Sequence, residues 1–187
     1  HKSLGDVLQS LNRSTEAEVS FKKAIAIQPD FTDAFSNLGL VLKELDRLEE
    51  AAASHTRAVV LKPDSAEVHN ILANTLKELG KLEESAASHT RALVLKPDYA
   101  EAHNNLGNTL KELGRLEEAL ASYTQVLVLE PDSAIAHSNL GLVLQEMGRL
   151  DEAEASFRQA IVLKTDIAFV YNNLGILRQN QGRLEEA

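Results

Sequence analysis

The chain contains no cysteine and no tryptophan, and few of its residues are aromatic. Without cysteine it can form neither a disulfide nor a thiolate metal site. No apolar run approaches the roughly 18 residues of a membrane-spanning helix, and no signal peptide is visible. The formal net charge of −9 argues against a partner that presents a phosphate backbone. We therefore expect no membrane and no nucleic acid as partner, and a cytoplasmic location.

Proline is also scarce, and its four occurrences are evenly spaced, at Pro29, Pro63, Pro97 and Pro131. The residues between them repeat as well. Residues 97–130 read PDYAEAHNNLGNTLKELGRLEEALASYTQVLVLE, and most of these positions are identical in residues 63–96. A fixed period of 34 residues is typical of stacked structural repeats. The chain is therefore expected to be built from copies of one unit.

Each unit has the pattern of two helices. The first carries one apolar face, formed by Ala102, Leu106, Leu110 and Leu113. The second carries another, formed by Ala119, Leu120, Tyr123, Val126 and Leu127. These spacings of three and four residues place the side chains on one side of a helix, and the proline that follows cannot continue the second helix.

A column of residues that tolerate a positive φ angle separates the two helices. Its members are Asn12, Asp46, Gly80, Gly114, Gly148 and Gly182. This column predicts a left-handed stop at the end of each first helix. At the start of that helix, Asp64 with Glu67 and Asp98 with Glu101 have the spacing of a capping box.

The unit resembles the tetratricopeptide repeat. That family has leucine and a small residue in the first helix, then alanine, an aromatic residue and alanine in the second, then proline. One copy supplies Leu106-Gly107, Ala119, Tyr123, Val126 and Pro131. Other copies depart mildly from the pattern, with His55 and His89 at the aromatic position, Ser85 for alanine and Thr165 for proline. The resemblance covers the whole chain. It implies an all-α fold, a right-handed α-solenoid (superhelix) of antiparallel helix hairpins.

We expect residues 1–187 to form a single array. Whole repeats span residues 29–62, 63–96, 97–130 and 131–164, with truncated repeats at 1–28 and 165–187. Each unit would bury its apolar face only against its neighbours. Natural arrays end in capping units with polar outer faces, and neither end of this chain has one. The chain is therefore expected to be a piece of a longer array.

Six histidines raise the hypothesis of a metal site. Members of one histidine column lie a repeat apart, too far to share an ion whose ligands sit at about 2 Å. His55 and His89 are expected to be half-buried rings in place of aromatics. Pairs such as Glu117-Glu118 suit the start of a helix, and no known signature builds a catalytic triad. We expect no metal, no cofactor and no enzymatic activity.

Asparagines recur in neighbouring columns of the first helices, which in this family line the concave groove where partners bind. The candidate site consists of Asn37, Asn70, Asn74, Asn104, Asn105, Asn108, Asn139, Asn172 and Asn173. Residues three or four apart are neighbours on a helix, so Asn70 with Asn74 and Asn104 with Asn108 form amide patches. Because asparagine both donates and accepts, such a ladder can bond the backbone of an extended peptide. Alternatively, some asparagines bond between adjacent repeats and hold the superhelix.

The asparagine ladder resembles the superhelical arm of the O-linked N-acetylglucosamine transferases. Another subfamily grips the terminal carboxylate of chaperones with basic residues. Here the equivalent columns hold Asp33, Glu67, Glu101 and the asparagines, and only Lys2 occupies a suitable position. We therefore do not expect a chaperone-tail adaptor.

The predicted groove changes along its length. The acidic column gives way to Ile135 and Phe169, while Leu142 and Ile176 flank the later asparagines. We expect a polar N-terminal half and a more apolar C-terminal half, which could hold a partner's apolar side chain or the next domain. The alternative is ordinary scattered surface apolar residues.

Three functions stay open at this point. The first is a protein–protein interaction module that binds an extended peptide or partner segment in the groove. The second is the substrate-recruiting arm of a larger transferase whose catalytic domain lies outside this chain. The third is a scaffold that self-associates head to tail through its open ends, forming filaments if the contact does not close.

Overall fold

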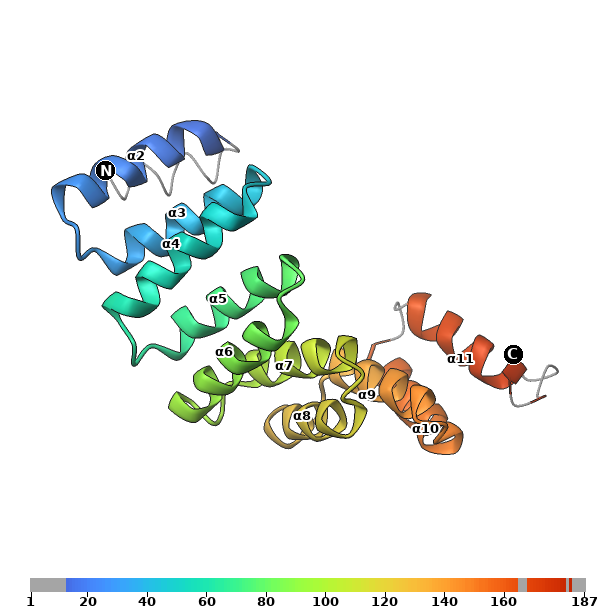
Figure 1. The fold of residues 1–187 in the computed structure, drawn as a ribbon. Helices are drawn as coiled ribbons and strands as arrows, with labels where there is room; N and C mark the ends of the chain where they lie inside the picture. The colour runs from blue at the N-terminus through green and yellow to red at the C-terminus, as the bar shows by residue number, and fades with distance from the viewer. Residues whose placement is uncertain (1–12, 165–167, 181, 183–187) are drawn as a thin grey trace. The chain divides into compact units, whose positions relative to one another are not determined.

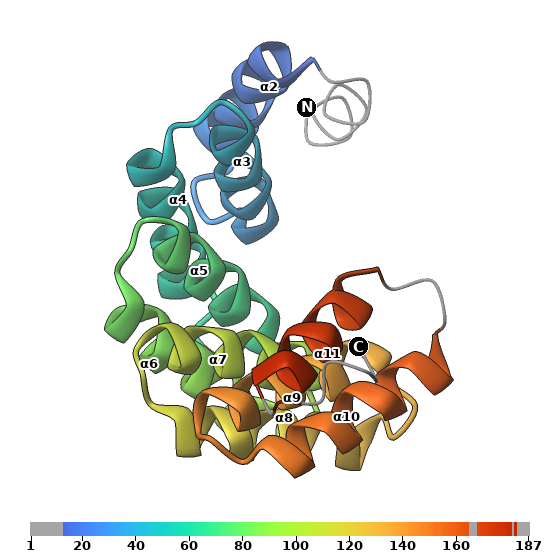
Figure 2. The same ribbon diagram turned by 90° about the vertical axis from the view of Figure 1, so that its right-hand side faces the viewer.

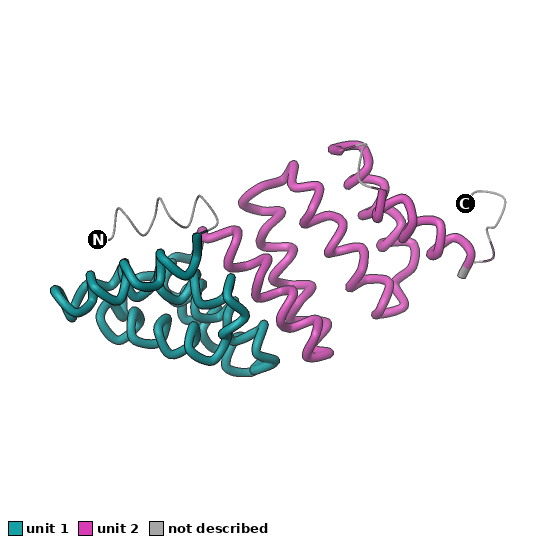
Figure 3. The backbone as a smooth tube through the Cα atoms, turned by 90° about the horizontal axis from the view of Figure 1, so that it is seen from above, with its two compact units in different colours: residues 1–97 teal, residues 98–187 magenta. Residues whose placement is uncertain are grey.

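The computed structural model describes residues 13–164, 168–180 and 182. The chain divides into two compact units, which we call unit 1 (His1–Pro97) and unit 2 (Asp98–Ala187) and which Figure 3 draws in teal and magenta. The regular elements of the described residues are all helices (Figure 1). The predicted all-α solenoid of helix hairpins is confirmed. The extent of the array, residues 1–187 in one body, stays a prediction.

Unit 1 holds five described helices: α2 (Ser14–Ile27), α3 (Thr32–Glu44), α4 (Leu48–Leu61), α5 (Ala66–Glu78) and α6 (Leu82–Leu95). Helices that follow one another in sequence contact each other, and α3 also contacts α5. Figure 2 shows α3 and α5 to the right of their hairpin partners α4 and α6. Unit 1 is thus a stack of hairpins in which first helices neighbour first helices.

Unit 2 repeats this arrangement with α7 (Ala100–Glu112), α8 (Leu116–Leu129), α9 (Ala134–Glu146), α10 (Leu150–Leu163) and α11 (Ala168–Asn180). Again consecutive helices contact one another, and α9 contacts both α7 and α11. The first helices of the two units, α3, α5, α7, α9 and α11, begin every 34 residues. The helical period therefore matches the sequence period.

The predicted left-handed stop is confirmed between the helices of each described hairpin. The φ angle is 58° at Asp46, 73° at Gly80, 72° at Gly114 and 75° at Gly148. The amide after the stop donates back to the helix it ends, as from Arg115 N to Leu110 O at 2.9 Å, which is the Schellman arrangement. Asn12, in the same column, lies outside the described residues.

The capping-box prediction is wrong, because the first helices begin one residue later than it requires. The N-cap of α5 is Ser65, whose Oγ accepts a hydrogen bond from Val68 N at 3.4 Å. Asp64 precedes that cap. The N-cap of α7 is Tyr99, which makes no side-chain capping bond. Ser133 caps α9 in the same way as Ser65 caps α5.

The aromatic column is buried on every second helix of the described residues. Phe21, His55, His89, Tyr123 and Phe157 are all fully buried. A Cβ atom at Gly107 would lie 2.7 Å from the Tyr123 ring, and one at Gly141 would lie 2.6 Å from the Phe157 ring. The small residue of the first helix therefore makes room for the ring of the second. The expectation that the two histidines are half-buried is wrong, since they occupy this same enclosed position.

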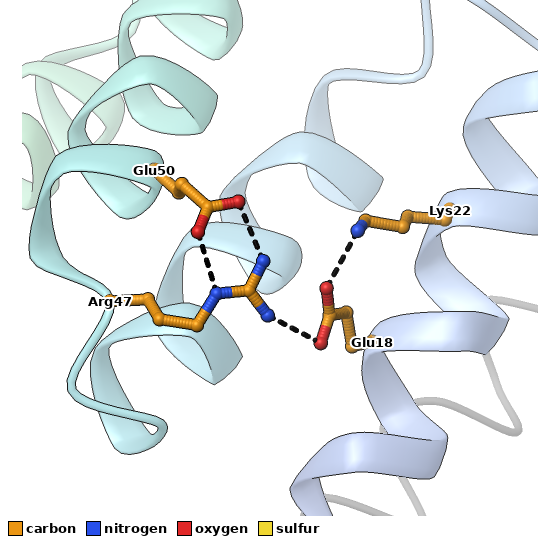
Figure 4. A network of polar contacts seen from close by, with 4 residues as sticks. All are labelled: Glu18, Lys22, Arg47 and Glu50. Carbon is orange, nitrogen blue, oxygen red and sulfur yellow. Dashed lines mark hydrogen bonds and ion pairs between the residues drawn. The ribbon is translucent and has the colours of Figure 1, made fainter.

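Acidic residues at the start of the second helices take part in ion pairs. In the turn before α4, Arg47 binds Glu50 and also reaches Glu18 on α2, which in turn binds Lys22 (Figure 4). Hydrogen bonds from Lys22 and Arg47 lower the pKa of Glu18. Equivalent pairs join Arg115 to Glu118 and Arg149 to Glu152. In unit 1 the network ties α2 to the hairpin that follows it.

Candidate functional site

The candidate asparagines of unit 1 differ in how far they reach solvent. Asn37 on α3 and Asn74 on α5 are half-buried. Asn70, also on α5, is only 1% exposed. A side chain this enclosed has almost no surface to offer a partner. The amide patch expected from Asn70 and Asn74 therefore presents mainly Asn74.

Unit 2 carries the other six candidates on three first helices that follow one another in the stack. Asn104, Asn105 and Asn108 lie on α7, Asn139 lies on α9, and Asn172 and Asn173 lie on α11. All are half-buried except Asn172, which is exposed. Contacts of α9 with both α7 and α11 make these helices neighbours, so the asparagines of unit 2 belong to adjacent repeats.

Two hydrogen bonds show that some of these amides have structural partners. Asn139 Nδ2 donates to Asn104 Oδ1 at 3.0 Å, which links α9 to α7. Asn108 Oδ1 accepts from the buried Tyr123 hydroxyl at 2.7 Å, which links α7 to α8. The alternative that asparagines bond between adjacent repeats is therefore correct for the first pair. An asparagine amide has two N–H donors and an acceptor oxygen, so one such bond does not exhaust Asn139.

A cavity of about 320 Å³ lies in unit 2 beside Asn173 on α11. Its lining residues come from α9, α10 and α11: Leu142, Gln145, Glu146, Leu150, Asn173 and Ile176. The predicted neighbours Leu142, Asn173 and Ile176 thus meet around one hollow. On the first turns of α9 and α11, Ile135 and Phe169 are 62% and 51% exposed. Exposed apolar side chains are thus present on the first helices of unit 2, and the change of the groove along its length stays a prediction.

Three lining residues, Gln145, Glu146 and Leu150, were not expected from the sequence. A signal for one of them was present, since the column that holds Lys43, Lys77 and Lys111 changes to Gln145. Two of these lysines pair with a glutamate of the next repeat in their own unit: Lys43 Nζ lies 2.6 Å from Glu78 Oε1, and Lys111 Nζ lies 3.6 Å from Glu146 Oε1. In unit 2 this pairing ends at Glu146. On α9 itself, Gln145 takes the place of a lysine that could pair with the following repeat.

The acidic column at the start of the first helices is solvent-exposed, with Asp33, Glu67 and Glu101 on α3, α5 and α7. Negative charge suits a helix N-terminus. Hydrogen bonds from its own backbone amide and from Ser65 lower the pKa of Glu67. A partner's carboxylate would meet negative charge at these positions. Lys2, the single basic residue suited to a carboxylate clamp, lies outside the described residues.

Two of the histidines, His55 and His89, serve the packing of their hairpins. His55 Nδ1 lies 2.9 Å from Thr75 Oγ1, and its Nε2 lies 3.1 Å from Ser36 O. Neither ring nitrogen of His89 has a hydrogen-bond partner. Burial lowers the pKa of both rings to about 4. Across the described residues, no group of three His, Asp or Glu side chains is placed to hold a metal ion.

A search of the helices in the described residues found none that is long and apolar enough to cross a membrane.

The fold and its motifs define an all-α repeat protein, and the family follows from sequence comparison. Models described as "Tetratricopeptide repeat" match residues 3–66 and 134–166, and one described as "TPR repeat" matches residues 73–114 and 107–148. Together these matches span most of the chain. The chain belongs to the tetratricopeptide repeat family. The finer resemblance, of its asparagine ladder to the arm of O-linked N-acetylglucosamine transferases, stays a prediction.

Solved structures share the fold at low sequence identity. MamA superposes with a TM-score of 0.81 at 24% identity, covering 88% of this chain and 96% of MamA. YrrB, described as "a TPR protein with an unusual peptide-binding site", has a TM-score of 0.79 at 22% identity, with 92% and 89% covered. TTC0263 from Thermus thermophilus has a TM-score of 0.69 at 24% identity, with 94% and 96% covered. Comparison with curated protein sequences found no significant match.

Proposed function

We propose that this chain is a protein–protein interaction module that binds an extended segment of a partner protein across the first helices of unit 2, without catalytic activity of its own. The observation that carries the proposal is a half-buried asparagine in the wall of an open hollow. Asn173 lines the cavity beside α9, and Asn139 holds the equivalent position one repeat earlier. YrrB, described as having an unusual peptide-binding site, gives the proposal a precedent on the same fold.

The chemistry of these amides favours the backbone of the partner as the group that is bound. An extended segment presents unpaired N–H and C=O groups, and each asparagine can satisfy one of each kind. Because Asn139 and Asn173 are half-buried, packing already restricts their rotamers. The entropy lost when they bind is correspondingly small. Binding would then depend on the shape of the backbone and on a few side-chain anchors.

The proposal is tested by a peptide-array scan with the parent chain and with an Asn139→Ala, Asn173→Ala variant. Losing about two hydrogen bonds at roughly 1 kcal/mol each lowers affinity about tenfold or more. The matched control is Gln159→Ala, which removes an exposed amide from the second helix α10. Circular dichroism checks that both variants keep their helices. Unchanged affinity of the double variant, or an array on which no peptide binds the parent, contradicts the proposal.

A further inference from the structure

We propose that the cavity between α9, α10 and α11 selects partner segments in which an apolar side chain of leucine size lies next to lysine or arginine. This inference rests on the proposed function and names the kind of segment that the same surface would accept. Two features of unit 2 carry it: the chemistry of the cavity walls and a carboxylate at its rim.

Two of the wall residues, Leu142 and Ile176, are apolar where the two repeats before α9 are polar. Leu142, Leu150 and Ile176 supply one apolar side chain from each of the three helices. The column of Leu142 and Ile176 holds Asn74 and Asn108 in the two preceding repeats. Ile176 is still 43% exposed, although each large apolar side chain gains about 1.5–3 kcal/mol from full burial. An incoming apolar side chain would cover it.

The volume matches this occupant. At about 320 Å³, the cavity stands at the lower end of the range of small-ligand sites, about 300–1,000 Å³. It is therefore large enough for one apolar side chain together with the adjoining backbone. Asn173 in the same wall can bond that backbone.

The rim carries negative charge with weak compensation. Glu146 lines the cavity, and its side chain is 48% exposed. Its lysine partner, Lys111, is 3.6 Å away, whereas Lys43 approaches Glu78 to 2.6 Å. On α9 the lysine of that column is replaced by Gln145. Glu146 keeps Lys111 as its partner, and a basic residue beside the partner's apolar side chain would meet this half-exposed carboxylate at a rim to which α9 adds no lysine.

The charge balance also favours a basic segment over a second copy of this chain. With a net charge of −9, two copies repel each other at low ionic strength. A segment that carries lysine or arginine is attracted, and the attraction weakens as salt screens it. Charge complementarity therefore selects the occupant.

The probes are three fluorescein-labelled peptides that share Gly-Ser flanks and differ in their central residues: Lys-Leu-Lys, Lys-Ser-Lys and Glu-Leu-Glu. Fluorescence anisotropy measures the affinity of each for the parent chain. The Lys-Leu-Lys peptide is expected to bind at least about tenfold more tightly than the other two. Equal affinity for all three peptides overturns the inference.

The chain offers a matched set of substitutions. Leu142→Asn introduces the residue that the equivalent positions Asn74 and Asn108 already carry, and it is expected to remove the preference for Leu over Ser. Leu40→Asn makes the same change in the same column of unit 1, and it should leave binding unchanged. Glu146→Gln, at a largely exposed side chain, is expected to abolish the preference for Lys over Glu. If Leu142→Asn fails to fold, Glu146→Gln decides the result alone.

The outcomes separate this inference from the proposed function. If array peptides lose affinity for the Asn139→Ala, Asn173→Ala variant but not for Leu142→Asn, the interaction module stands and the apolar cavity plays no part. If neither the array peptides nor these probes bind, both proposals fail. If Leu142→Asn instead dissociates an oligomer seen by sedimentation of the parent, the cavity belongs to a second copy and the inference is overturned.

Discussion

Acidification from about pH 7 to about pH 5 is expected to destabilise unit 1 through its two buried histidines. His55 and His89 are fully buried within the hairpins α3–α4 and α5–α6. Both nitrogens of the His89 ring lack a partner, so a proton there would be a buried charge without compensation. The equivalent positions of unit 2 hold Tyr123 and Phe157, and neither of these acquires positive charge on acidification.

The sign and size follow from proton binding in the two states. The pKa of each ring is 6.5 in its ordinary state and about 4 in the fold. Between these values the unfolded chain binds more protons, so the free energy of unfolding is greatest above about pH 6.5 and falls as the pH decreases toward 4. At about pH 5 the loss is roughly 2 kcal/mol per histidine and roughly 4 kcal/mol for both. That is a large share of the ~5–15 kcal/mol by which domains are usually stable.

Urea unfolding and amide hydrogen exchange at the two pH values measure the effect. Faster exchange, after correction for intrinsic rates, is expected in α3–α6 and not in α7–α10. The control variant combines His89→Phe with Ala73→Gly. This repeat then carries the same pair of phenylalanine and glycine as Phe157 and Gly141 in unit 2. This variant should lose about half of the pH effect. An unfolding free energy that does not change between the two pH values would refute the reasoning.

Three further predictions concern packing, the turns and the ion pairs. Gly107→Ala is expected to cost about 1–3 kcal/mol, because its Cβ would meet the Tyr123 ring at 2.7 Å. Urea unfolding should show no such steric penalty for Gly175→Ala, because beyond its own helix backbone the Cβ has no atom of the described residues within 4 Å. Asp46→Gly is expected to stabilise the chain by about 1 kcal/mol, since Asp46 has a φ of 58°; a lower thermal midpoint would contradict this. Arg47→Met removes the hydrogen bonds to Glu18 and Glu50, so the thermal midpoint should fall, and fall less in high salt.

The repeat made most of the fold predictable. A period of 34 residues, a positive-φ column and a proline column define where helices end, and the observed helices follow them. The exact start of each first helix was less predictable, because Asp64 and Ser65 are both good capping residues and only the backbone geometry shows that Ser65 takes the role. The burial of His55 could have been inferred from its column, since the aromatic residues there face a glycine.

The places of the candidate residues on the first helices were predictable, and their contacts were less so. Columns on the first helices located the asparagines, the apolar change at Leu142 and the loss of acidic residues at the start of the later first helices. Which amides face solvent depends on three-dimensional packing: Asn70 is enclosed, and Asn108 accepts the Tyr123 hydroxyl. Leu150 reaches the cavity from the start of α10, and no pattern along a first helix points to a residue on the next helix.

Positions at which the repeats agree and positions at which they differ have different physical meanings in this chain. The agreeing columns are explained by packing, since the glycine stop and the pair of ring and small residue recur in the hairpins of both units. A departure at such a column changes stability, as the histidines of unit 1 are expected to do under acid. A departure on the half-buried side of a first helix, outside these packing columns, changes what the surface can bind. Leu142 and Gln145 are departures of this second kind, and they meet at one cavity. For this reason the cavity of unit 2 is the first place to test for partner binding.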